Sequence, residues 1–182
     1  MLDKEGFTPL HWAALKLNVE DKGEMQLFHR LINAIGDVNV TDKSERIALY
    51  LASEENLPLV VKVLIEDGRA DPNKQTNYGT APLHVASKLG YSAVVELLLS
   101  AENIDVNIKN KYGSTPLHLA SKYGHEEVVQ LLIKNLRTKV DEKDKSGKTA
   151  LDLASNLEVV KILKRANRKR KLYKIEAPRA RL

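Results

Sequence analysis

Cysteine is absent from this 182-residue sequence, and aromatic residues make up only 5% of it. The lack of cysteine excludes a disulfide framework and any thiolate zinc site, and it is compatible with a reducing compartment. No apolar run approaches the ~20 residues that a membrane-spanning helix needs. The first residues, Met1 to Glu5, lack the basic and apolar pattern of a signal peptide. These absences favour a soluble, cytoplasmic protein.

Charge is divided unevenly along the chain. The net value is +5, but residues 161–182 contain ten Lys or Arg and one acid, which gives +9. The residues before them therefore sum to −4. A mildly acidic body is thus followed by a strongly basic tail, and the two parts need separate interpretation.

One short motif returns five times. Its copies begin at Thr8, Ile47, Ala81, Thr115 and Thr149, and the fourth copy reads Thr-Pro-Leu-His-Leu-Ala-Ser. The central leucines of the last four copies are 34 residues apart, while the first step is 39 residues. A fixed period of this size predicts stacked units that cannot bury their apolar faces alone. A stacked array presents a long surface, which favours the binding of another macromolecule.

The fourth unit, residues 110–143, predicts two helices after a turn. Thr115 is a favourable N-cap, and Pro116 suits the first helical position, where its missing N–H has no cost. Gly124 is expected to end this helix. The apolar residues within 128–133 then predict the buried stripe of a second helix.

With these features each unit resembles an ankyrin repeat, which has a β-turn finger, an inner helix opening with Thr-Pro-Leu-His-x-Ala, and an antiparallel outer helix. The resemblance implies an all-α solenoid of stacked helix-turn-helix units with short β-turn fingers. It assigns residues 1–163 to the repeat domain, with repeats at about 3–41, 42–75, 76–109, 110–143 and 144–163. Residues 164–182 form the basic C-terminal tail.

Several units depart from the common pattern. The first carries extra residues, placed at Leu15 to Lys22 between its two helices. Glu45 stands where the other four units have glycine, so we expect strain if this turn needs a positive φ. Ala81 replaces the capping threonine of the third unit. The fifth unit is shortened, as a terminal capping unit would be.

The sequence contains no recognisable catalytic, metal or cofactor site. His11, His84 and His118 recur at the unit spacing, but Tyr50 and Asp152 fill the same position in the other units, which is not a metal-ligand pattern. The resemblance implies instead that these imidazoles form hydrogen bonds between neighbouring fingers. No Gly-rich phosphate loop or catalytic motif is present. We therefore expect a protein that is not an enzyme and uses no cofactor.

The resemblance also implies a partner-binding groove, formed by the finger tips and by the residues at the ends of the inner helices. Carried onto this sequence, it gives a cluster of tyrosines, lysines and one leucine in the third to fifth units: Tyr78, Lys88, Leu89, Lys111, Tyr112, Lys122, Tyr123, Lys145 and Lys148. Aromatic residues at the centre of an interface often contribute most of the binding free energy. Lysines around them favour a partner with acidic residues. We expect an acidic protein segment with apolar anchors. The alternative is that Tyr112 and Tyr123 merely pack on each other.

The basic tail has several interpretations. Its cations are Lys164, Arg165, Arg168, Lys169, Arg170 and Lys171. They suit a nuclear import signal, a nucleic-acid or anionic-membrane patch, or a recognition element for an export machine. They also suit a helix C-terminus that only aids solubility.

Taken together, these patterns predict a monomeric, non-catalytic module that binds a partner protein in its groove. The alternative is anchoring to nucleic acid or an anionic membrane through the tail. The repeats also resemble those abundant in intracellular bacteria as well as in eukaryotes, and a basic C-terminus is common on proteins that such bacteria inject into hosts. An effector in the host cytosol therefore stays open, as does a nuclear location.

Overall fold

The computed structural model describes residues 3–17, 20–67 and 69–176, with side chains described as far as Lys169. Over these residues the regular secondary structure is helical, without strands. The helices are α1 (Pro9–Lys16), α2 (Lys22–Ala34), α3 (Ala48–Glu54), α4 (Pro58–Glu66), α5 (Pro82–Leu89), α6 (Ser92–Ser100), α7 (Pro116–Tyr123), α8 (Glu126–Lys134) and α9 (Leu157–Glu176). In this described part of the chain, every helix is too short or too polar to cross a membrane.

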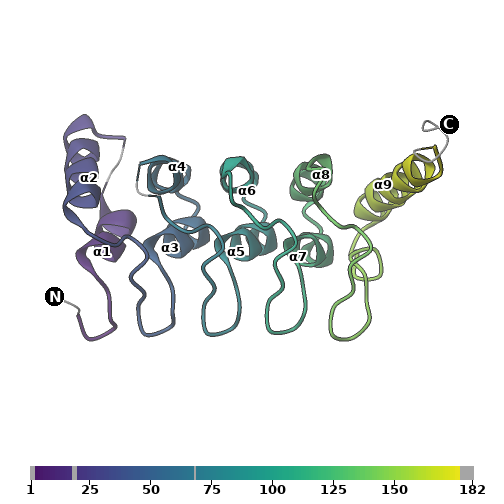
Figure 1. The fold of residues 1–182 in the computed structure, drawn as a ribbon, viewed down its shortest axis with the longest axis horizontal. Coiled ribbons are helices and arrows are strands. Elements are labelled where there is room, and N and C mark those ends of the chain that lie inside the picture. Colours follow the sequence, from purple (N-terminus) through teal and green to yellow (C-terminus); the bar gives the residue numbers. More distant parts are fainter. Residues whose placement is uncertain (1–2, 18–19, 68, 177–182) are drawn as a thin grey trace.

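The helices form two layers above a row of loops (Figure 1). In the inner layer α1, α3, α5 and α7 pack side by side, and in the outer layer α4, α6, α8 and α9 do the same. The β-turn loops that precede the inner segments hang below both layers, and we call them fingers. This arrangement confirms the predicted all-α solenoid.

The core lies between the two layers and runs the length of the array. Leu49, Leu83 and Leu117, the central leucines of the motif, are each at most 1% exposed. Full burial of a leucine stabilises the fold by about 1.5–3 kcal/mol. Since the inner helices also contact their neighbours in the next repeat, stacking completes the burial that one repeat alone could not provide.

Local sequence signals set both ends of the inner helices. In α7 the Thr115 side chain accepts a hydrogen bond from the His118 N–H, and Pro116 occupies the first turn. Gly124 ends the helix in the left-handed region, at φ 77°. α5 follows Ala81 without a side-chain cap. The start and the end of α7 are those that the sequence predicted, and α5 lacks a side-chain cap as the replacement of threonine by Ala81 led us to expect.

The fingers are joined to one another by backbone hydrogen bonds. The Lys111 N–H donates to the Tyr78 carbonyl at 3.1 Å, and the Lys145 N–H donates to the Tyr112 carbonyl at 3.0 Å. Equivalent bonds join the earlier fingers. The fingers therefore form a continuous ladder, which fixes their spacing along the array.

The motif histidines connect each inner helix to the next finger. His84 is fully buried; its Nδ1 accepts from the Ala81 N–H at 3.1 Å, and its Nε2 donates to the Ser114 carbonyl at 2.9 Å. His11 and His118 make equivalent bonds in their own repeats. These are the finger contacts that the ankyrin resemblance implied, and they require a neutral imidazole with its proton on Nε2.

The first and last repeats differ from the middle ones. α2 has 13 residues against 9 in each of α4, α6 and α8. Of the extra residues placed at Leu15 to Lys22, the first two belong to α1 and Lys22 begins α2. The others lie in the connection after Lys16, where residues 18 and 19 are outside the described residues. In the fifth repeat, residues 150–153 form a turn in place of an inner helix.

Glu45 adopts a strained backbone conformation. Its φ is 60°, in the left-handed region that the glycines of the other fingers also occupy. This conformation costs a residue with a side chain about 1–2 kcal/mol. The positive φ on which the expectation of strain depended is thus present.

Replacing Glu45 with glycine should therefore stabilise the protein. Relief of the strain is partly offset by the conformational entropy that glycine loses on folding, about 0.5–1 kcal/mol. We expect a net gain of about 0.5–1 kcal/mol in the free energy of unfolding, measured by urea denaturation. The matched control is Gly113→Ala, which should destabilise, because its φ is 75° and the added Cβ would lie 2.8 Å from the Lys145 backbone nitrogen. A loss of stability in Glu45→Gly would contradict the strain account.

Candidate partner-binding groove

A groove of about 760 Å³ runs between the inner helices α5 and α7 and the fingers of the third to fifth repeats. Eight of the nine residues predicted to bind a partner lie in it: Tyr78, Lys88, Leu89, Tyr112, Lys122, Tyr123, Lys145 and Lys148. The ninth, Lys111, lines a neighbouring hollow between fingers, together with Glu45 and Asn77. The fold therefore brings residues from three repeats to one concave surface.

Three tyrosines and a leucine present apolar surface in this groove. Tyr78 and Tyr112 are each 68% exposed, Tyr123 is 48% exposed and Leu89 is 38% exposed. In the described part of the chain the contacts between aromatic rings lie in the first repeat, and none joins Tyr112 to Tyr123. Both rings therefore leave surface open that a partner could bury.

Four lysines lie in the same groove, and two of them approach the Tyr123 ring. The Lys88 Nζ lies 5.8 Å from the centroid of the Tyr123 ring, and the Lys122 Nζ lies 5.9 Å from it, within the range of a cation–π interaction. Lys145 and Lys148 approach from the last finger. Among the side chains that the structure describes, no ion pair neutralises any of these four lysines.

The two acids of the groove already have partners. Asp144 shapes the last finger by accepting hydrogen bonds from the Ser146 N–H at 2.8 Å and the Lys148 N–H at 2.9 Å. Glu54 lies 3.5 Å from Arg46. Burial raises the pKa of the Glu54 carboxyl above its usual value, although Arg46 acts in the opposite direction. The four lysines therefore outweigh the negative charge in the groove.

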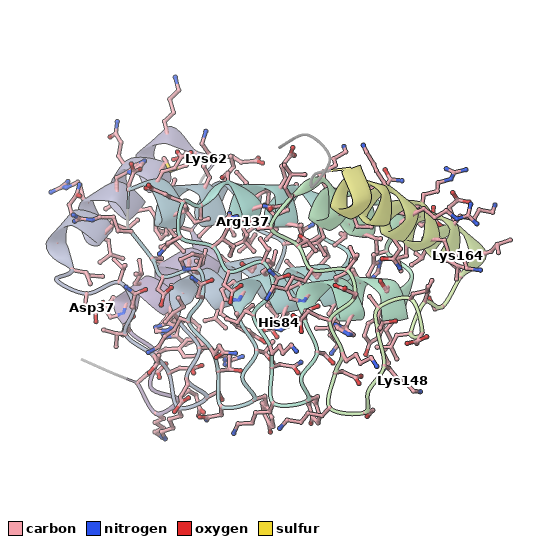
Figure 2. The ribbon with its side chains drawn as sticks, turned by 45° about the vertical axis from the view of Figure 1, so that its right-hand side comes forward. Asp37, Lys62, His84, Arg137, Lys148 and Lys164 are labelled. Carbon is pink, nitrogen blue, oxygen red and sulfur yellow. The ribbon has the colours of Figure 1, made fainter. Side chains whose placement is uncertain are left out.

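His84 forms part of the groove wall but has no free nitrogen to offer. Both ring nitrogens are used in the finger contacts, and Figure 2 shows the residue between the helices and the fingers. Burial lowers the pKa of the His84 imidazole to about 4, so it is neutral at pH 7. No group of three or more His, Cys, Asp or Glu side chains within the described residues is placed to hold a metal ion.

Sequence reasoning missed the apolar floor of the groove. Val85, Leu119 and Leu153 line it, and all three occupy the variable position that follows the histidine slot of the motif. A position that changes within an otherwise repeated motif was the available signal. The side chain at this variable position lies on the concave face and differs between units.

The basic residues assigned to the tail lie largely on a helix. α9 runs across the predicted boundary between residues 163 and 164. Lys164, Arg165, Arg168 and Lys169 are exposed on it. Arg170 and Lys171 have a helical backbone, and their side chains lie outside the described residues.

Comparison with known families agrees with this geometry. A model described as three copies of the ankyrin repeat matches residues 17–110, more than half of the sequence, and a model for many copies matches residues 98–154. A comparison with curated proteins finds no match. Ankyrin repeats are generally protein–protein interaction modules and are typically non-catalytic. The stacked repeats and both matches show that this chain belongs to the ankyrin repeat family.

Proposed function

We propose that the chain binds a partner protein in the groove of its third to fifth repeats, and that the partner contributes an acidic segment with apolar anchors. The observation that carries the proposal is the convergence of exposed tyrosines and unpaired lysines in one concave surface. Ordinary exposed residues are scattered, whereas a concave surface with aromatic anchors and convergent charges is typical of a binding site.

The charge of the groove favours a carboxylate-bearing partner. Lys88 on α5 and Lys122 on the neighbouring helix α7 both approach the Tyr123 ring. A carboxylate that lies beside these two ammonium groups, and not over the electron-rich face of the ring, would offset their positive charge. Complementary charge of this kind raises the association rate and selects against basic segments.

The tyrosines would supply most of the binding free energy. Tyrosine buries a large ring and loses little conformational freedom, and such residues dominate the energetics of interfaces. Tyr112 lies on a finger and Tyr123 ends an inner helix, so together they contact both sides of the groove. Apolar side chains of a partner fit between them and Leu89.

Replacing Tyr112 and Tyr123 together with alanine should weaken binding by about 2 kcal/mol or more, which is roughly thirtyfold in Kd. Stability should change little, since both rings are substantially exposed. In the first step, peptides that bind the full chain are selected from a displayed random library. The affinity of the selected peptides is then determined by fluorescence anisotropy for the wild type and the variant.

The matched control removes two exposed apolar side chains outside the groove, Leu59 and Leu136, which are 41% and 94% exposed. This control should bind as the wild type does, and the selected peptides should combine Asp or Glu with apolar residues. Equal binding by the tyrosine variant and the control would disprove the site. Selection of basic peptides would disprove the class of partner.

A further inference from the structure

Helix α9 is much longer than the helix on which it packs. It has 20 residues, whereas α8 has 9; at 1.5 Å per residue these lengths are about 30 Å and about 14 Å. α9 contacts α8, and in its first half Val159 and Leu163 are each at most 1% exposed. The second half therefore extends past the outer layer, at the right of Figure 1.

The packed face of α9 leaves a cationic face toward solvent. Lys161, Lys164, Arg165 and Arg168 are all exposed, and we call these four residues the α9 row. They occupy positions i, i+3, i+4 and i+7, which lie on one side of an α-helix. The row therefore places four cations in a line about 10 Å long.

Most of this charge is not neutralised within the protein. The Lys161 Nζ lies 3.1 Å from a Glu158 carboxylate oxygen. Among the described side chains of α9, that is the one ion pair, and the other three members of the row have none. Lys169 is exposed beside the row, and the sequence continues with Arg170 and Lys171.

The α9 row and the groove are separate surfaces with different chemistry. Figure 2 shows Lys164 on α9 and Lys148 on the finger below it. The groove interleaves lysines with exposed tyrosines and Leu89, whereas the row contains only Lys and Arg. The groove therefore suits a partner with apolar anchors, and the row suits a ligand that is recognised by charge.

We propose that the α9 row binds the phosphate backbone of a nucleic-acid duplex. A duplex is a linear polyanion with one charge per about 1.7 Å of axis, and a line of cations on a rigid helix matches this geometry. The phosphate backbone is common to DNA and RNA, so the chemistry of the row applies to both.

An anionic membrane fits the row less well. An interfacial helix needs a free apolar face that it can bury among the lipid chains. On the described part of α9 Val159 and Leu163 are buried, and Ile162 packs partly buried against the core. Leu157 is 69% exposed, but one side chain does not make an apolar face. Attraction to a membrane would then rest on charge alone, with a single line of cations against a plane of headgroups.

The proposed binding has a characteristic salt dependence. If Lys164, Arg165, Arg168 and Lys169 each neutralise one phosphate, the affinity should fall about 100-fold between 50 and 200 mM salt. Because the row offers no described aromatic platform, we expect little preference for base sequence. A groove partner held by apolar anchors should depend on salt much less.

The test uses the full chain with labelled duplex DNA and duplex RNA of unrelated sequences, in fluorescence anisotropy over a salt series. The variant is Lys164→Glu/Arg165→Glu/Arg168→Glu. The control, Lys43→Glu/Lys62→Glu/Lys74→Glu, makes the same change in net charge at exposed positions away from α9. A second arm measures sedimentation with phosphatidylcholine vesicles, with and without phosphatidylserine. Circular dichroism checks that both triple variants remain folded.

We expect at least one duplex to bind with the steep salt dependence, and the α9 variant to lose more than about tenfold in affinity. The charge-matched control should lose much less, and Tyr112→Ala/Tyr123→Ala should bind the duplex as the wild type does. The DNA and RNA arms then identify the ligand. Equal loss in both triple variants would overturn the proposal, since net charge would explain it. Binding to phosphatidylserine vesicles alone, or to neither duplex at 50 mM salt, would also overturn it.

Discussion

Replacing His84 with alanine should lower the free energy of unfolding by about 3–5 kcal/mol. The imidazole is fully buried and bonds both the Ala81 N–H and the Ser114 carbonyl. Its removal leaves a cavity and two buried backbone groups without partners, and each such group costs about 1–3 kcal/mol. Chemical denaturation of the two proteins at pH 7 gives the measurement.

The control for this loss is His29→Ala. The His29 ring is 40% exposed and faces Asp67 at 3.2 Å, and exposed ion pairs contribute only about 0–1 kcal/mol. We expect a change of that size. If His84→Ala were no more destabilising than His29→Ala, the histidine contacts between repeats would not be a major source of stability.

Stability should also fall as the pH is lowered from about 6.5 toward 4. Burial lowers the pKa of His84 to about 4, while an unfolded histidine has a pKa near 6.5. Between these values the unfolded chain binds the proton and the folded chain does not, so protonation favours unfolding. The shift corresponds to about 3 kcal/mol, which is fully present above the unfolded pKa and lost as the pH falls through the folded one. Burial lowers the pKa of His118 as well.

This pH effect can be isolated by comparison with His84→Gln. The glutamine variant cannot titrate at this position, so its stability should depend less steeply on pH over the same range. Carboxylates such as Asp152, whose pKa is lowered by hydrogen bonds from Thr149, act at lower pH in both proteins. Parallel stability profiles for the wild type and the variant would show that His84 does not carry the acid sensitivity.

The regular part of the fold was predictable because the residues that start and end each helix lie within a single repeat. The threonine cap, the proline in the first turn and the left-handed glycine define α7 without reference to its neighbours. Comparison between units also singled out Glu45, which has a positive φ; Asn56 and Arg69 share this feature, and the comparison did not indicate them. The stacking of the units was predicted from the 34-residue period, because the sequence of a single unit does not indicate it.

The two ends of the array were less predictable. The fifth motif retains Thr149 and Leu151 but forms a turn, because helix formation there depends on covering neighbours as well as on propensity. α9 continues past Ala166, where the sequence offers mainly charged residues and no further apolar period. The extra residues of the first unit lie between its two helices, as expected, but the greater length of α2 had no separate signal.

The composition of the groove was predictable to the extent that the repeat pattern assigns positions to a face. Tyr78, Tyr112 and Tyr123 reach one surface because they recur at finger and helix-end positions. Lys111 lies elsewhere, since the side to which a finger residue points depends on how the fingers stack. The floor residues could be predicted only from the variable position within the motif. They come from three different repeats, so no single repeat indicates that they lie together.

The central claim is that a partner segment binds in the groove of the third to fifth repeats. The most direct test is amide chemical-shift mapping of the full chain with an acidic peptide selected from the displayed library. The account predicts that the perturbed amides include Tyr78, Leu89, Tyr112 and Tyr123, while those of α2 and α9 stay unchanged. Perturbations confined to α9 or to the fingers of the first two repeats would contradict it.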